Sequence, residues 1–463
     1  MAAAVVTVVA LLAAGVVYVL RHERPAYPSA WNPRVASIAA FVQNARGLTW
    51  KHPVNVSFLT PAQFDAKVDT PRAGSGSTHP TAQQQIELAR AFGLEWGVVG
   101  PSTIPTSTWV GGLAADYDPS KKAVYVDGPV LTPFAAAALA HALTSALEDE
   151  YFSLRHLISG SAERRTAASA LVEGTADRVE LAYVGALPLA QAREYQQEYQ
   201  QEAVAVERVS AGLPAFEADE IGFPDDFGAT LVDALFAQGG SAEVDEAFRT
   251  PPTLDGEVVN PANFQPGLPT PKVNAPLVPA GATKILPAQG FGEVPLVEML
   301  GYEIGFSAAW RAAAGWTGDQ FVAYTYDGHS CAALSVLTDN AADAGALAVA
   351  GSVWSHHVPG ALVTEAGLTV NFRSCDPGPT WRPADGGDQS FRYMAARASL
   401  IAGFIAVWHF DADGATCVAD QLLARLGPDQ LLQDSTLSTL SSPAGRAFSV
   451  AVRQAAPQCG ISG

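Results

Sequence analysis

Charged residues are scarce in this chain: Asp, Glu, Lys and Arg make up only 16% of its 463 residues. Basic residues are the rarer kind, because 27 Lys and Arg stand against 46 Asp and Glu, and the formal net charge is −19. Nucleic-acid binding needs clustered positive charge to neutralise phosphates, so an ordinary nucleic-acid partner is excluded. General disorder is excluded too, because 48% of the residues are hydrophobic and 20 Phe, 12 Tyr and 9 Trp can fill a core.

Cysteine is also rare. The chain has four, Cys331, Cys375, Cys417 and Cys459, and none are spaced as the Cys-x-x-Cys pair of a zinc finger or ribbon. An even number of widely spaced cysteines is typical of two disulfides in an oxidising compartment. Three connectivities are possible, and proximity in the chain favours Cys331 with Cys375 and Cys417 with Cys459. Four buried free thiols are the alternative.

Residues 1–20 carry no charge at all. As a helix they would span roughly 30 Å, which predicts a transmembrane helix or uncleaved signal anchor. The basic start and clear cleavage site of a removable signal peptide are lacking. Arg21, His22 and Arg24 follow the run and would favour the cytoplasmic side, whereas the cysteines favour an extracytoplasmic body. We therefore expect a single-pass protein of the cell membrane whose main body is extracytoplasmic.

Hydrophobic periodicity predicts a mainly helical domain with a small sheet over residues 35–250, after a linker at 21–34. Turn residues and glycines mark the ends of its elements. The expected strands are 54–58, 96–99 and 123–126, and the expected helices are 35–45, 84–92, 133–155, 162–184, 187–211 and 226–248, the last broken at Gly239 and Gly240.

Proline is concentrated in residues 251–290, at positions 251, 252, 261, 266, 269, 271, 276 and 279. Such a density forbids regular structure and predicts an extended connector. The remainder, 291–463, carries all four cysteines and is expected to be a smaller α+β module. Its predicted strands are 321–338 and 361–372, and its predicted helices are 341–354, 389–405 and 415–426. The fold class of the whole chain is thus α+β.

Two helical segments carry a resemblance to a known family. LAHALTSALEDEYF, residues 139–152, resembles the zinc-binding helix (HELTHALQDQ) of a group of bacterial extracytoplasmic gluzincin-type metallopeptidases. LVEGTADRVELAY, residues 171–183, resembles the EGxA helix that supplies their third zinc ligand. Shorter similarities extend over roughly residues 35–350: RGLTWKHPVNVSFLTPAQF from Arg46, ADYDPSKKAVYV from Ala115, FGATLVDALFAQGG, AFRTPPT, and AAAGWTGDQFVAY from Ala312. The resemblance implies a zincin-like scaffold for residues 35–250.

The family's chemical residues are only partly present. The resemblance places His141 as the first zinc ligand and Glu173 as the third, but Ala142 where the general base belongs and Ser145 where the second ligand belongs. Alanine cannot take a proton from water, and general-base assistance contributes roughly 10²- to 10⁴-fold in rate. A neutral hydroxyl is a poor zinc ligand beside an imidazole. We therefore expect no catalytic residues and no bound metal or other cofactor, with His141 and Glu173 as vestigial ligands hydrogen-bonded to each other.

Polar residues near His141 in the sequence are not expected to replace the missing zinc ligand. Glu148 and Asp149 lie two helical turns after His141, about 10 Å along the axis, which is too far for one ion. Together with Glu150 they are predicted to be solvated or helix-pairing carboxylates, and His156 to be a loop residue. Ser145 beside His141 lacks the GxSxG elbow of a nucleophilic serine.

Three further groups are predicted to be structural: His409 with Asp411 and Asp413 as a turn, His356 with His357 as a loop end, and Trp316 with Asp319 as a turn contact.

The expected function is a membrane-anchored, extracytoplasmic pseudo-metallopeptidase. Its role would be non-catalytic binding, scaffolding or regulation in the bacterial cell envelope, with the membrane and another envelope protein as partners. The competing hypothesis is an active zinc metallopeptidase that uses His141, Glu173 and an unidentified third group. A third hypothesis is a carrier of an envelope ligand in the former cleft.

Overall fold

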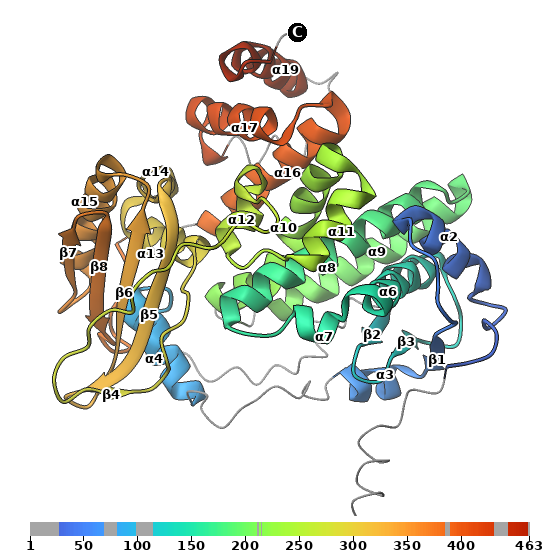
Figure 1. Ribbon diagram of the computed structural model, residues 1–463, viewed down its shortest axis with the longest axis horizontal. Helices are drawn as coiled ribbons and strands as arrows, with labels where there is room; N and C mark the ends of the chain where they lie inside the picture. The colour runs from blue at the N-terminus through green and yellow to red at the C-terminus, as the bar shows by residue number, and fades with distance from the viewer. Residues whose placement is uncertain are drawn as a thin grey trace, which may run out of the picture.

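The computed structural model describes residues 27–68, 81–98, 114–210, 213, 215–384, 389–429 and 443–461. The transmembrane helix expected at 1–20 lies outside the described residues. Within the described ranges, no helix is both long and apolar enough to cross a membrane. The described chain is a mixed α+β structure with two small sheets at opposite ends of its long dimension and helices between them (Figure 1).

The first sheet holds three strands, in the order β1-β3-β2, with β1 parallel and β2 antiparallel to β3. Helix α6 packs against β2 and β3. The alternation along β3 buries Val124 and Val126, which share one apolar cluster with Leu139 and Leu143 of α6. The predicted strands at 54–58 and 123–126 are confirmed. The bounds are β1 Asn55–Leu59, β2 Ala115–Asp118 and β3 Ala123–Asp127.

The helices expected in the first 250 residues are also confirmed, most with small changes at their ends, although the last begins at residue 215 and not at 226. Residues 96–98, by contrast, do not form the expected strand, since 97 and 98 are a bend, and residue 99 lies outside the described residues. The Trp96 ring packs 4.9 Å from that of Tyr302, whereas Val98 is exposed. The bounds are α2 Ala36–Arg46, α3 Pro61–Val68, α4 Ala82–Phe92, α6 Pro133–Phe152, α7 Leu154–Leu157, α8 Ala162–Gly185, α9 Leu189–Ser210, α10 Ala215–Gly239 and α11 Ser241–Arg249.

Helices α8 and α10 are in direct backbone contact. A Cβ atom added to Gly174 of α8 would lie 2.1 Å from the carbonyl carbon and oxygen of Gly228 of α10. A Cβ atom on Gly228 would lie 2.2 Å from the backbone oxygen of Ala170. The helices can approach this closely only because both positions are glycine. On its other side, α8 packs on α6.

The proline-rich segment is only partly an extended connector. Residues 264–282 contain no helix or strand, as expected, but α12 (Asp255–Val259), a 3-10 helix (Pro261–Asn263) and the short strand β4 (Thr283–Lys284) correct the prediction for the rest. The prolines do not prevent these elements, because Pro261 occupies the first position of its helix, where no backbone N–H is needed. Burial of Val258 and Val259 holds the segment to the body.

The second sheet has five antiparallel strands in the order β4-β5-β6-β8-β7. Each of the two long strands predicted here is a hairpin. Helix α4, from early in the chain, packs against β6 and β8, and Arg90 at its end forms a bidentate ion pair with Asp376 at 2.8 and 2.7 Å. The bounds are β5 Trp316–Tyr326, β6 His329–Thr338, β7 Leu362–Ala366, β8 Thr369–Cys375, α13 Glu293–Ile304, α14 Phe306–Ala313 and α15 Ala341–His357.

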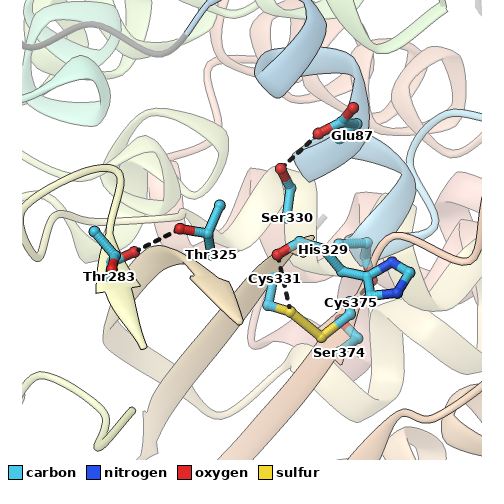
Figure 2. The surroundings of a disulfide bond; sticks show 9 residues. Glu87, Thr283, Thr325, His329, Ser330, Cys331, Ser374 and Cys375 are labelled. Atoms are coloured by element: carbon cyan, nitrogen blue, oxygen red, sulfur yellow. Dashed lines mark hydrogen bonds between the residues drawn. A yellow bond between two sulfur atoms is a disulfide. The ribbon is translucent and has the colours of Figure 1, made fainter. Parts of the chain in front are cut away.

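The pairing Cys331–Cys375 and Cys417–Cys459 is confirmed. Cys331 and Cys375 lie opposite each other on β6 and β8, as Figure 2 shows. Cys417 lies in α17 (Ala412–Leu426), and Cys459 ends the 3-10 helix Ala456–Cys459 that follows α19 (Pro443–Ala455). The disulfides close loops with sequence separations of 44 and 42 residues. On a chain-entropy basis, each contributes about 4 kcal/mol to stability.

The last helices pack on the helical body. Helix α16 (Ser390–Trp408) lies along α10, where the Thr230 hydroxyl donates to the backbone oxygen of Ala398 at 2.9 Å. Arg397, which is 1% exposed, pairs with Asp420 of α17 and donates to the backbone oxygen of Val259. One apolar cluster therefore runs from α4 through α10 to α17, across the connector. The domain division at 251–290 stays a prediction.

The contact between α8 and α10 makes a testable prediction. Gly174→Ala should destabilise the fold by about 3 kcal/mol or more, because the added methyl group has no room and the backbones must separate. Gly345→Ala in α15 is the control, since its added Cβ meets nothing within 4 Å. Because alanine has a higher helix propensity than glycine, Gly345→Ala should stabilise the fold by up to about 1 kcal/mol. Chemical denaturation measures both, and equal stabilities of the two variants would contradict the close contact.

Candidate functional site

One imidazole and three carboxylates meet between α6 and α8. His141 is on α6, and Glu173, Asp177 and Glu180 follow one another at helical spacing on a single face of α8. Nε2 of His141 lies 3.0 Å from Oε2 of Glu173. Its Nδ1 lies 3.3 Å from Oδ1 of Asp177 and 3.3 Å from Oε2 of Glu180. The structure thus brings together the two residues that the family resemblance aligned, and adds two more.

The site is partly open to solvent and strongly acidic. The four side chains are between 16% and 36% exposed, so ions and water can reach them. Burial opposes a charge on His141, but hydrogen bonds to Asp177, Glu173 and Glu180 outweigh it and raise the pKa of the imidazole well above its ordinary value. Burial also raises the pKa of Asp177, and His141 opposes that rise. The arrangement favours a cation at its centre.

The two remaining family positions offer no chemistry. Ala142 is 2% exposed and belongs to the apolar cluster beneath the first sheet, and Ser145 is 8% exposed. On the Nε2 side of the ring, the aligned residues therefore supply one imidazole nitrogen and one carboxylate, already in contact with each other. Three protein ligands and an open position are what a catalytic zinc needs. The residues at the aligned positions do not fit the family's zinc.

A different donor set is better placed. Among the described residues, His141 with Asp177 and Glu180 is the one group of at least three ligand atoms close enough for a metal ion, all within 4.8 Å of one another. Sequence reasoning missed Asp177 and Glu180. Their spacing could have identified them, because residues four and seven positions after Glu173 lie on the same helix face as Glu173.

The acidic residues later in α6 are structural, and not solvated. Glu148 is fully buried and pairs with Arg46 of α2 at 2.7 Å, and Arg46 also pairs with Asp245 of α11 at 2.8 Å. Burial raises the pKa of Glu148 to about 7, against the opposing effect of Arg46. The helix-pairing interpretation thus holds for Glu148.

Asp149 and Glu150 tie α6 to the segments around the first sheet. Asp149 accepts from the Tyr117 hydroxyl at 2.6 Å and pairs with Lys122. Glu150 accepts from the backbone N–H of Lys51 at 2.7 Å. None of these carboxylates joins the group around His141. His156 lies in the single helical turn α7, and not in a loop.

The other predicted structural residues are placed as follows. Asp411 accepts from the backbone N–H of Gly414 at 2.7 Å and caps α17, as a turn residue does, but Asp413 lies inside that helix. The Trp316 indole donates to Asp319 at 3.0 Å, which confirms the contact, but both residues belong to strand β5 and not to a turn. Helix α15 includes His356 and His357 as its last two residues, so the prediction that they end a loop is wrong.

A second group of carboxylates lies between the connector and the second sheet. Asp255 accepts from the backbone N–H groups of Glu293 and Val294 at the start of α13. Asp319 accepts from those of Phe291 and Gly292. Burial raises the pKa of Asp255 to about 7, of Asp319 to about 6 and of Glu293 to about 8. Because the oxygens of Asp255 and Asp319 are used by backbone donors, the group organises the chain and is not a metal site.

Comparison with protein-family models, with curated proteins and with solved structures found no match to this chain. The resemblance to gluzincin-type metallopeptidases therefore rests only on the sequence motifs in α6, α8 and their neighbouring segments.

The buried carboxylates make stability depend on pH. The folded pKa of Glu293, about 8, exceeds its ordinary value of 4.5, so the folded state binds more protons between these values. The contribution of Glu293 to the free energy of unfolding is present below its ordinary pKa and is lost as the pH rises through its folded pKa. Glu293→Gln should therefore reduce the loss of stability between about pH 5 and about pH 8 by more than about 1 kcal/mol.

Urea denaturation at the two pH values measures this difference. The control is Glu365→Gln, the same chemical change at an exposed position of β7. An unchanged pH dependence in Glu293→Gln would contradict the raised pKa.

Proposed function

We propose that this protein is a pseudo-metallopeptidase, anchored to the membrane, whose body lies outside the cytoplasm and binds another component of the bacterial cell envelope. One observation carries the proposal. His141 and Glu173 lie 3.0 Å apart on two packed helices, as a zincin-like scaffold requires, while Ala142 and Ser145 stand at the positions of the general base and the second ligand.

The missing general base weighs most against catalysis. In a zinc peptidase the base removes a proton from water as the water attacks the peptide carbonyl. The residue after His141 has a methyl side chain buried among apolar residues, so it can neither accept that proton nor contact water. What remains is an acidic, partly exposed surface suited to binding a cation or a basic segment of a partner.

The alternative, an active zinc metallopeptidase with an unconventional ligand set, draws support from Asp177 and Glu180. Each supplies a carboxylate within 3.3 Å of His141. These residues supply ligands but leave position 142 without a base. The pseudo-metallopeptidase is therefore the function that the site favours.

Hydrolysis of unfolded casein tests this proposal. The purified full chain supplied with zinc should release no more peptide than buffer, with or without a zinc chelator, because no general base is present. Chelator-sensitive cleavage by the unmodified chain would establish the alternative and end the proposal.

Restoring the family residues provides the positive arm. Ala142→Glu combined with Ser145→His should raise zinc affinity at least about tenfold over the parent, because two imidazoles and Glu173 then face one position. Ala142→Gln with Ser145→Asn is the matched control, and should leave affinity unchanged. No gain in the first variant would contradict the zincin-like scaffold.

The compartment is proposed from the two disulfides, which form and persist in oxidising surroundings, together with the apolar residues 1–20. Labelling of intact cells with a membrane-impermeant thiol reagent tests it. Labelling should appear only after treatment with reductant, because all four cysteines are paired and outside the cytoplasm. Labelling that requires cell lysis would place the body inside.

A further inference from the structure

We propose that His141, Asp177 and Glu180 form a binding site for one divalent transition-metal ion, held on Nδ1 of the imidazole. This is the opposite ring nitrogen from the one that contacts Glu173, the residue that the resemblance aligns with the third zinc ligand. The inference rests on the proposed function in one respect: Nε2 of His141 is in contact with Glu173 and is not occupied by a catalytic metal.

The spacing of the ligand atoms fits an ion. Both carboxylate oxygens lie 3.3 Å from Nδ1, and all three atoms lie within 4.8 Å of one another. Ligands about 2.0–2.1 Å from a tetrahedral metal are about 3.3 Å apart. A separation of 3.3 Å is long for a hydrogen bond between such groups, whose usual length is about 2.7–2.9 Å. Small side-chain adjustments would therefore suffice to place an ion among the three.

Counting protons leads to the same site. The hydrogen bond to Glu173 places a proton on Nε2, which leaves Nδ1 of a neutral ring with a lone pair. Asp177 and Glu180 are acceptors only, and both point at this nitrogen. Without a metal, a single proton on Nδ1 can satisfy only one of them, whereas a metal ion that displaces this proton binds both carboxylates and the lone pair. Histidines that bind metals typically donate their other N–H to a carboxylate in the same way.

Neighbouring groups support the same assignment. The Tyr195 hydroxyl of α9 donates to Oε1 of Glu180 at 3.3 Å, which leaves Oε2 for the ion. With the imidazole neutral, Glu173, Asp177 and Glu180 carry a local charge of about −3, which a divalent ion reduces to about −1. One imidazole with two carboxylates is typical of Zn²⁺, Co²⁺ or Mn²⁺, whereas Ca²⁺ and Mg²⁺ prefer oxygen ligands alone.

Isothermal titration of the chelator-treated full chain with zinc chloride tests the inference. We expect one ion per chain. Asp177→Asn and Glu180→Gln should each weaken binding by more than about 100-fold. Glu173→Gln, which removes only the orienting carboxylate, should weaken it by roughly 10- to 100-fold. The matched control is Glu194→Gln on the exposed side of α9, which should bind as the parent does.

Ring-nitrogen NMR shifts of His141 identify the atom that binds. Zinc should move the Nδ1 signal far more than the Nε2 signal, a result that a merely structural role for Asp177 and Glu180 would not produce. The inference is overturned if zinc fails to bind, if the Nε2 signal moves instead, or if Glu173→Gln is the most damaging substitution.

Casein hydrolysis, measured on the same zinc-treated sample, separates the two proposals. Zinc on Nδ1 without cleavage supports both. The absence of both binding and cleavage overturns the metal site and leaves the pseudo-metallopeptidase standing. Chelator-sensitive cleavage overturns the pseudo-metallopeptidase, and with it the premise that Nε2 is free of metal.

Discussion

The contact between Gly174 and Gly228 is the constraint on which the rest of the structure depends. It brings the backbones of α8 and α10 together without side chains between them, so α8 has one position available against α10. The opposite side of α8 then faces α6 and presents its acidic residues to His141. Gly174 therefore has a packing role that requires no metal ion.

Paired and buried carboxylates hold the elements around this helix pair. Arg46 joins α2 to α6 through Glu148, and to α11 through Asp245. Removing one partner of such a group leaves an uncompensated buried charge, which is far costlier than the loss of a surface pair. These buried carboxylates of the chain are thus structural. The group around His141 differs, because its three carboxylates share the one or two N–H protons of a single imidazole.

The helices and the disulfide pairing could be predicted because their signals are local. The periodicity of residues 133–152 and the even, separated cysteines needed no knowledge of the fold. Helix α13 was not predicted, because it is buried nearly all round and so lacks an amphipathic pattern. Helix α14 was also not predicted, although its buried residues do share one face. The proline-rich segment was only partly predicted, since a proline at the first position of a helix is compatible with it.

The sequence by itself determined the spacing of residues along each helix, and its family resemblance suggested His141 and Glu173 as vestigial ligands, with Ala142 and Ser145 in place of the other two groups. Only the tertiary structure decided what the other carboxylates do. Glu148 and Asp149 are near His141 in sequence but are engaged by Arg46 and by Tyr117. Asp177 and Glu180 reach the imidazole because α8, whose position against α10 is set by Gly174 and Gly228, also packs on α6. The distances between helices depend on how the helices pack, and the spacing of residues within one helix does not determine that packing.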